Sequence, residues 1–332
     1  MKRKLLPAVL VVLLLAAAGA FVLRWCGSPP CGGRRCEFTV ERGWGARTIS
    51  RALSDSGLVR CRLYILWRYS VMEGAPPLQA GTYSLDDSMT PDSILGIIAR
   101  GEVIPVATSW VTLAPGLTLE QSLEIISRST PIDRDDLDSL ARDRDFLDSL
   151  GVPSLEGYLY PETYEFADTL SAVEMLERIV DTGRSRWPGD LEENLEHTGL
   201  SPHETMILAS IVEREARVDS ERPLVAGVFL GRLRRGMRLE SCATVQYALG
   251  QVREVLLYRD LEVDHPYNTY RSHGLPPGPI CSPGSLSIHA AVHPDTSQGY
   301  IYFVSRDDGT GRHLFARTHA GHLANIRSIP DR

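Results

Sequence analysis

An uncharged, apolar run from Leu5 to Leu23 constrains this chain more than any other feature of its sequence. As a helix the run is about 28 Å long, close to the ~30 Å hydrocarbon core of a membrane. Basic residues precede it within Met1–Lys4, and the positive-inside rule keeps that end in the cytoplasm. We therefore expect residues 1–27 to form a cytoplasmic stub and a single transmembrane anchor in the plasma (inner) membrane, with the rest of the chain extracytoplasmic or periplasmic.

Two other interpretations of the N-terminus involve cleavage. A secretory signal peptide needs small residues before its cleavage site, and Ala16–Ala20 supplies them, but the apolar run continues beyond this segment. A lipoprotein signal would need small residues before Cys26, where the chain has Leu23-Arg24-Trp25. An uncleaved anchor fits the sequence better than either.

The remaining length divides into a small and a large domain. A chain of 332 residues allows two or three domains, and residues 28–35, rich in proline and glycine, form a linker. Residues 36–106 follow the order strand, helix, helix, strand, and residues 107–332 form a larger mixed domain, so the predicted class is α+β. The elements expected in the small domain are strand 38–40, helix 46–57, helix 63–72, strand 81–85 and a helix from Pro91 to Ile98.

Charge and cysteine content exclude some classes of function. A net charge of −7 argues against a nucleic-acid partner, because binding to phosphates needs concentrated positive charge. The segment 119–150 is predicted to be helical, and its mixed charges at helical spacing are typical of a solvated face rather than of a calcium site. An extracytoplasmic location would permit disulfides among the first four cysteines, with the connectivity open, and the spacing indicates no metal site. The six cysteines are Cys26, Cys31, Cys36, Cys61, Cys242 and Cys281.

A buried helix in the second half carries a candidate acid. Ser201-Pro202-His203-Glu204 is a capping box with proline at the first helical position. The residues at 206–212 are apolar nearly all round, so the helix should be buried. Glu213 follows this run directly, and a carboxyl group in such surroundings suits a general acid. The alternative is structural: Glu213 and Glu215 could pair with the nearby arginines Arg214, Arg217 or Arg222.

An ordered set of motifs over nearly the whole chain resembles the YceG-like family, the MltG-type endolytic murein transglycosylases. Each motif alone is weak, but the ordered set is highly specific. The resemblance includes the anchor and a LysM-like subdomain at 36–106. The motifs are Leu155-Glu-Gly-Tyr-Leu-Tyr-Pro-Glu-Thr-Tyr164, Ile207-Leu-Ala-Ser-Ile-Val-Glu-Arg-Glu215, Pro266-Tyr-Asn-Thr-Tyr270, Gly274-Leu-Pro-Pro-Gly-Pro-Ile280, Ala291-Val-His-Pro294, Tyr300-Ile-Tyr-Phe-Val304 and His313-Leu-Phe315.

The resemblance implies that Glu213 is the catalytic residue, with Glu215 as the fallback. It also implies a substrate cleft. Tyrosine rings pack on the C–H faces of sugars, and side-chain amides can bond to N-acetyl groups; for Tyr158, Tyr160 and Tyr270 core packing is an equal alternative. The residues expected to line the cleft are Glu156, Tyr158, Tyr160, Glu162, Glu215, Gln246, Asn268, Thr269 and Tyr270.

Two positions depart from the family pattern. The chain has Cys242-Ala243 before its Thr-Val pair, where family members often carry Asp-Pro. If that aspartate assists substrate binding, its absence puts the details of the site in doubt. The second departure is Ala114-Pro115-Gly116 in place of Pro-Glu-Gly. We expect neither departure to touch Glu213.

The implied reaction needs only one carboxyl group. Glu213 would protonate the oxygen leaving the MurNAc-β-1,4-GlcNAc bond and then, as a base, accept the proton of the MurNAc C6 hydroxyl, which closes a 1,6-anhydro ring. The substrate supplies the nucleophile, so positioning replaces a second acid. No metal, nucleotide or redox cofactor is required. The expected partners are peptidoglycan glycan strands and the plasma membrane, and the resemblance adds peptidoglycan synthases and division proteins.

Other functions fit the sequence less well than this one. A hydrolytic muramidase would use Glu162 or Glu240 as a second carboxylate, and a non-catalytic glycan-binding scaffold would need no acid. A pyridoxal-phosphate lyase needs a Schiff-base lysine, but the only lysines, Lys2 and Lys4, precede the apolar run. A Ser/His/Asp hydrolase lacks a G-x-S-x-G motif. His293, which precedes a proline, is typical of a structural turn, and a structural role is favoured over a place in the cleft for His313 and His322.

Overall fold

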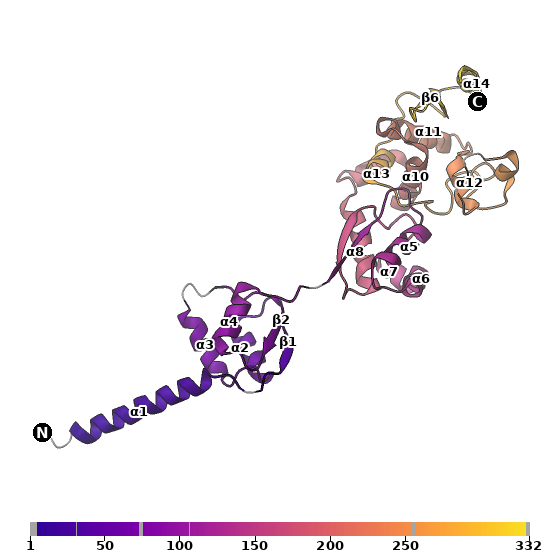
Figure 1. The fold of residues 1–332 in the computed structure, drawn as a ribbon. Helices are drawn as coiled ribbons and strands as arrows, with labels where there is room; N and C mark the ends of the chain where they lie inside the picture. The colour runs from indigo at the N-terminus through magenta and orange to yellow at the C-terminus, as the bar shows by residue number, and fades with distance from the viewer. Residues whose placement is uncertain are drawn as a thin grey trace. The chain divides into compact units, whose positions relative to one another are not determined.

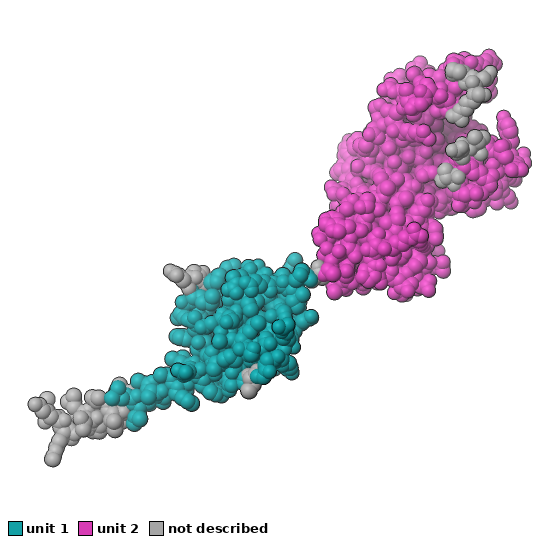
Figure 2. Space-filling view, in the orientation of Figure 1, with its two compact units in different colours: residues 1–106 teal, residues 107–332 magenta. Residues whose placement is uncertain are grey.

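The computed structural model of the protein describes residues 5–30, 32–72, 76–105, 107–251, 253 and 256–329, with side chains from residue 13 onward. The chain divides into two compact units, residues 1–106 and residues 107–332 (Figure 2). Among the described residues, helices combine with three two-stranded antiparallel sheets. The mixed α+β class predicted from the sequence is therefore confirmed.

Helix α1 spans Leu5–Cys26 at the start of the first unit (Figure 1). The basic segment Met1–Lys4, predicted to be the cytoplasmic stub, lies outside the described residues. Within the part of the chain whose side chains are described, no helix has both the length and the apolar character needed to cross a membrane. The anchor therefore stays a prediction.

The rest of the first unit is a small sheet covered by helices. Strands β1 (Arg35–Val40) and β2 (Gly81–Asp86) pair antiparallel with Phe38 opposite Tyr83, and their inward side chains pack against the helices. The order strand, helix, helix, strand agrees with the expectation; the LysM-like assignment stays a prediction. The helices are α2 (Ala46–Asp55), α3 (Arg62–Val71) and α4 (Pro91–Arg100).

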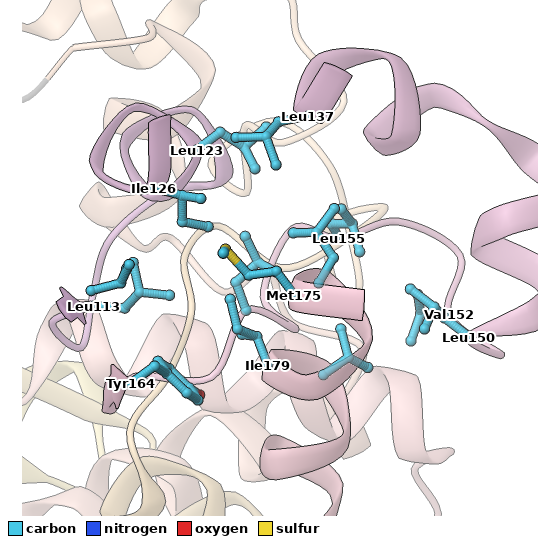
Figure 3. Packing of buried hydrophobic residues seen from close by; sticks show 14 of the residues in the cluster. Leu113, Leu123, Ile126, Leu137, Leu150, Val152, Leu155, Tyr164, Met175 and Ile179 are labelled. Carbon is cyan, nitrogen blue, oxygen red and sulfur yellow. The ribbon is translucent and has the colours of Figure 1, made fainter. Parts of the chain in front are cut away.

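One apolar core of the second unit lies among its first elements. Strands β3 (Thr108–Thr112) and β4 (Thr163–Ala167) pair antiparallel. Figure 3 shows side chains from these elements and from the nearby helices meeting in the core, among them Leu123, Leu137 and Ile179. The helices are α5 (Leu119–Ser129), α6 (Arg134–Arg142), α7 (Arg144–Ser149) and α8 (Ala172–Ser185).

The acidic segment 119–150 is helical, as predicted. It forms three short helices, because Asp133 and Asp143 each cap a new helix through their side chains. Within the segment Arg134 forms ion pairs with three carboxylates, those of Glu120, Glu124 and Asp138. The mixed charges therefore serve contacts between helices as well as solvation.

A second core surrounds α10 (Pro202–Glu215), which packs against α11 (Arg222–Arg234) and α13 (Ser285–Val292) (Figure 1). Ser201 and Glu204 form the predicted capping box, and the residues at 205–212 are buried, so both expectations for this helix are confirmed. The remaining elements are α9 (Leu191–Thr198), α12 (Cys242–Ala248), 3-10 helices at Asp219–Glu221 and Tyr258–Glu262, β5 (Tyr302–Ser305), β6 (His313–Ala316) and α14 (His319–Ser328).

Candidate active site

Three helices meet at the Glu213 side chain. Glu213 lies in the last turn of α10, Arg222 is the first residue of α11, and Gly284 is the N-cap of α13. One carboxylate oxygen of Glu213 accepts a hydrogen bond from the Gly284 amide at 2.9 Å, and the other lies 3.2 Å from the Arg222 guanidinium. The Glu213 side chain is 9% exposed and that of Arg222 is 12% exposed. The carboxyl group is thus nearly buried and is held from two sides, by a guanidinium group and by a backbone amide.

A cavity of about 180 Å³ opens beside this carboxyl group. A Cβ atom at Gly284 would lie 3.4 Å from a Glu213 oxygen and 3.4 Å from the Pro115 ring, so glycine at this position keeps the cavity open. The cavity is lined by Pro115, Tyr160, Pro161, Glu213, Arg222, Gly284, Ser285 and Leu286.

The two departures from the family pattern lie at different places. Pro115, in the second of these departures, lines the cavity of Glu213. The sequence could not reveal this proximity, because backbone hydrogen bonds between Gly116 or Leu117 and Ser282 bring distant segments together. Cys242 lies instead beside Tyr270, whose hydroxyl group is 3.2 Å from the cysteine sulfur.

Glu215 supports the neighbouring helix α12. Its carboxylate accepts hydrogen bonds from the Ser241 hydroxyl at 2.5 Å and from the Ala243 amide at 3.4 Å. A carboxylate at the N-terminus of a helix satisfies free amide groups and interacts favourably with the helix dipole. These contacts favour a structural role for Glu215 and leave Glu213 as the carboxyl group with an adjoining cavity.

Asn268 and Thr269 are buried and hydrogen-bonded within the chain. The Asn268 side chain donates to the carbonyl oxygens of Leu261 and Val263 and accepts from the Tyr270 amide. The Thr269 hydroxyl accepts from the Ser241 amide and pairs with another threonine hydroxyl. Buried polar groups of this kind are usually structural, so this geometry favours positioning of the loop over direct contact with substrate.

Glu156 lies in a second, larger cavity of about 460 Å³. Its side chain accepts hydrogen bonds from the Tyr247 hydroxyl and the Leu119 amide, both at 3.0 Å. Burial raises the pKa of Glu156 to about 7, although these hydrogen bonds act in the opposite direction. Gln246 lines the same cavity and donates to the Arg253 carbonyl oxygen.

The two cavities are neighbours. Glu213 lines the first and the next residue, Arg214, lines the second; similarly, Pro115 lines the first and Thr118 the second. Arg214 also donates to the Gly116 carbonyl oxygen at 3.3 Å. The segment 115–118 and the end of α10 therefore form a shared wall.

Two of the predicted tyrosines, Tyr158 and Tyr160, line a third cavity of about 470 Å³, which is mostly apolar. The Tyr158 hydroxyl lies 2.8 Å from Nδ1 of His203, and the two rings are stacked. Tyr160 is buried and lines both this cavity and that of Glu213. Glu162 lies outside these cavities and pairs with Arg186 at 2.9 Å.

Sequence reasoning missed part of the site. It named Arg222 only as a partner in the structural alternative, and the structure bears out that pairing. It did not identify Gly284 or Tyr247. The only sequence signal for Gly284 was its position before a short apolar helix. The only signal for Tyr247 was its position next to Gln246, which was predicted to line the cleft. The histidines His293 and His313 are held by Asp190 and Glu221, each at 2.8 Å.

Comparison with known proteins gives matches over most of the chain. A family model described as the YceG-like family matches residues 38–328. A protein of Bacillus subtilis (strain 168) named endolytic murein transglycosylase is 29% identical over 291 residues, which cover 82% of this chain and 79% of that protein. A protein of the same name from Streptococcus pneumoniae serotype 2 is 28% identical over 320 residues, covering 86% of this chain and 57% of that protein. The crystal structure of a yceG-like protein from Listeria monocytogenes has a TM-score of 0.58 and 30% identity, covering 88% of this chain and 99% of the other.

Proposed function

Because this chain belongs to the YceG-like family, we propose that it is an endolytic lytic transglycosylase, a lyase that cleaves MurNAc-β-1,4-GlcNAc bonds within nascent peptidoglycan strands and leaves 1,6-anhydro-MurNAc ends. The observation that carries the proposal is the Glu213 carboxyl group, nearly buried, held from two sides and adjoining a cavity. The names of the relatives from Bacillus subtilis and Streptococcus pneumoniae support the same activity.

In this proposal Glu213 acts first as an acid and then as a base. It protonates the glycosidic oxygen of the leaving sugar, and the resulting carboxylate accepts the proton of the MurNAc C6 hydroxyl as that oxygen bonds to C1. Arg222 and the Gly284 amide stabilise the carboxylate that exists between these two steps and fix its orientation. The chain supplies positioning and one proton-transfer group, while the substrate supplies the nucleophile.

The positions of the other carboxylates support lytic cleavage over hydrolysis. A hydrolytic enzyme needs a second carboxylate across the scissile bond. The two candidates, Glu162 and Glu240, pair with Arg186 and Arg232, at 2.9 and 3.1 Å, and neither lines the cavity of Glu213.

The neighbouring cavities offer sites for the rest of the strand. We assign the amide of Gln246 and the carboxyl group of Glu156 to polar groups of the glycan in the second cavity. Tyr160 connects the cavity of Glu213 with the apolar one, where Tyr158 would pack on a sugar face. An endolytic enzyme must bind sugars on both sides of the bond it cleaves, and the two cavities near that of Glu213 offer candidate sites for them.

We also propose that the chain is anchored in the plasma membrane by a single helix, with the residues from 28 onward outside the cytoplasm. The support is the apolar run from Leu5 to Leu23 and the basic residues before it. We expect the full chain to stay in the membrane fraction after washing with high salt, and a chain beginning at residue 28 to be released. Release of both chains would overturn the anchor, and a mature chain beginning after residue 20 would indicate a signal peptide.

The activity is tested by mass spectrometry of the products that the full chain forms from purified glycan strands. We expect internal cleavage with 1,6-anhydro-MurNAc ends, and a loss of at least ~100-fold in Glu213→Gln. Glu215→Gln is the matched control and should retain activity once its circular dichroism spectrum shows that it is folded. Reducing ends in place of anhydro ends would indicate a muramidase. No cleavage by the folded full chain in membranes would indicate a glycan-binding scaffold.

A further inference from the structure

The end of helix α1 is docked against the start of α3 within the first unit. The Arg60 guanidinium lies over the Trp25 ring, 5.3 Å from its centre. The same guanidinium donates hydrogen bonds to the carbonyl oxygens of Pro29 at 3.0 Å and Pro30 at 2.6 Å. One arginine beside α3 therefore holds both the last turn of α1 and the segment that follows it.

A close approach at Gly27 strengthens this contact. A Cβ atom at this position would lie 2.7 Å from the Tyr64 hydroxyl oxygen, closer than packed atoms can come. Tyr64 belongs to the first turn of α3. The backbone directly after Cys26 thus packs against the Tyr64 side chain, three residues after Cys61.

Two cysteine thiols meet at this contact. Cys26 is the last residue of α1 and is 5% exposed, while Cys61 is the half-buried N-cap of α3. Burial alone would raise the pKa of Cys61. A hydrogen bond from Cys26 and the backbone amides of Tyr64 and Leu63 outweigh burial and lower that pKa below the usual 9.0. The two side chains are thus within hydrogen-bonding reach of each other, and the direction of the shift favours Cys61 as the first of the two thiols to react.

We propose that Cys26 and Cys61 form a disulfide bond that fixes the end of α1 to α3. The oxidant is an external disulfide, carried by a small molecule or by a protein. The Cys61 thiolate attacks it, which forms a mixed disulfide and releases one thiol. The Cys26 thiolate then attacks the Cys61 sulfur and releases the second thiol. Two thiols of this chain are oxidised, one external disulfide is reduced, and the two protons go to the released thiolates.

The bond would act on the direction in which α1 leaves the first unit. Without the bond, that direction depends on the noncovalent contacts of Arg60, Trp25 and Gly27. A covalent link between Cys26 and Cys61 would reduce the number of conformations open to the unfolded chain and so favour the folded arrangement. Of the other cysteines near α1, Cys36 lies in strand β1 and Cys31 is outside the described residues. The inference concerns the first unit alone and does not rest on the proposed cleavage of glycan.

The test maps the disulfide in the purified full chain. The protein in detergent is equilibrated with oxidised glutathione, its remaining thiols are alkylated, and it is digested without reduction for mass spectrometry. We expect one linked peptide pair, joining Cys26 to Cys61, which persists in the control variant Cys36→Ser. Linkage of Cys61 to Cys31 or Cys36, or alkylation of both Cys26 and Cys61 after equilibration, would overturn the proposal.

Two further measurements separate the two thiols. In Cys26→Ser the reaction should stop after its first step, so Cys61 should carry glutathione; in Cys61→Ser, the buried Cys26 should remain largely unmodified. Thermal unfolding gives an independent readout: a reductant should lower the unfolding temperature of the oxidised wild type and leave the double variant Cys26→Ser/Cys61→Ser unchanged. An equal response of both proteins would contradict a stabilising bond at this position.

Discussion

Arg222 is the residue whose removal should most affect the surroundings of Glu213. The two side chains are only 12% and 9% exposed, and removing one partner of a buried pair leaves an uncompensated charge. We expect Arg222→Met to lower the free energy of unfolding by about 3 kcal/mol and to reduce glycan cleavage, since the Glu213 carboxylate loses its cation. Urea unfolding followed by tryptophan fluorescence measures the first effect.

The control for this variant uses the second partner of Arg222. Asp219 also pairs with the Arg222 guanidinium, at 3.1 Å, but is 67% exposed. Asp219→Asn should therefore change the stability by less than about 0.5 kcal/mol. If Asp219→Asn and Arg222→Met changed the free energy of unfolding equally, the buried pair of Arg222 and Glu213 would contribute no more to stability than the exposed pair with Asp219.

Glu156 should make the stability depend on pH. Burial raises its pKa from 4.5 to about 7 in the folded chain, so the folded state keeps a proton that the unfolded state releases as the pH rises through this window. The contribution of this group is full below pH 4.5 and is lost as the pH approaches 7. The shift corresponds to roughly 3 kcal/mol.

Glu156→Gln removes this titration while keeping a similar shape. We expect wild type to lose more stability than Glu156→Gln when the pH is raised from 4.5 to 7, by up to the roughly 3 kcal/mol that the shift represents. Urea midpoints of both proteins across this range measure the difference. Parallel curves would show that Glu156 titrates alike in the folded and unfolded chains.

At the scale of elements, α11 depends on its close approach to the loop that follows α13. A Cβ atom at Gly227 would overlap the carbonyl oxygen of Asp295, and the Asp295 amide donates to the Pro223 carbonyl oxygen at 2.9 Å. Alanine has a higher helix propensity than glycine, but here the overlap with Asp295 outweighs that gain. We therefore expect Gly227→Ala to lower the free energy of unfolding by about 2 kcal/mol. Cleavage should fall as well, because α11 carries Arg222.

A glycine in open space provides the comparison. A Cβ atom at Gly189 has no neighbour within 4 Å, so Gly189→Ala should stay within about 0.5 kcal/mol of wild type. Thermal unfolding of both alanine variants, with activity measured on the same samples, gives the answer. A stable and fully active Gly227→Ala would show that α11 can shift without disturbing Arg222.

At the scale of the whole molecule, each unit has its own hydrophobic core. The core of the first unit contains Ile49, Leu53 and Tyr83, and those of the second unit lie around β3–β4 and around α10. A unit with a complete core can fold alone. We expect residues 107–332 alone to unfold at the same urea midpoint as this unit in the full chain, and to cleave soluble glycan strands in a reaction that Glu213→Gln abolishes. A lowered midpoint would show that the second unit needs residues 1–106 for stability.

The sequence alone determined the features that depend on neighbouring residues. The capping box at Ser201–Glu204, the burial of α10 and the position of Glu213 at its end follow from local hydrogen bonding and periodicity. The order of elements in the first unit followed from similar signals, such as the αL Gly101 that ends α4. The helical character of the acidic segment 119–150 was also predicted, and the aspartate caps at Asp133 and Asp143 divide it into three helices.

Only the tertiary structure decided what surrounds Glu213. Arg222, Gly284 and Pro115 come from separate elements, and their meeting depends on how α10, α11 and α13 pack, which no periodicity encodes. The predicted cleft residues also separate for this reason. Glu156 and Gln246 share one cavity, Tyr158 and Tyr160 line another, and the side chain of Asn268 is hydrogen-bonded inside the fold. A sequence motif identifies residues that matter to the protein. Which of them line a cavity and which are hydrogen-bonded inside the fold depends on contacts between distant segments.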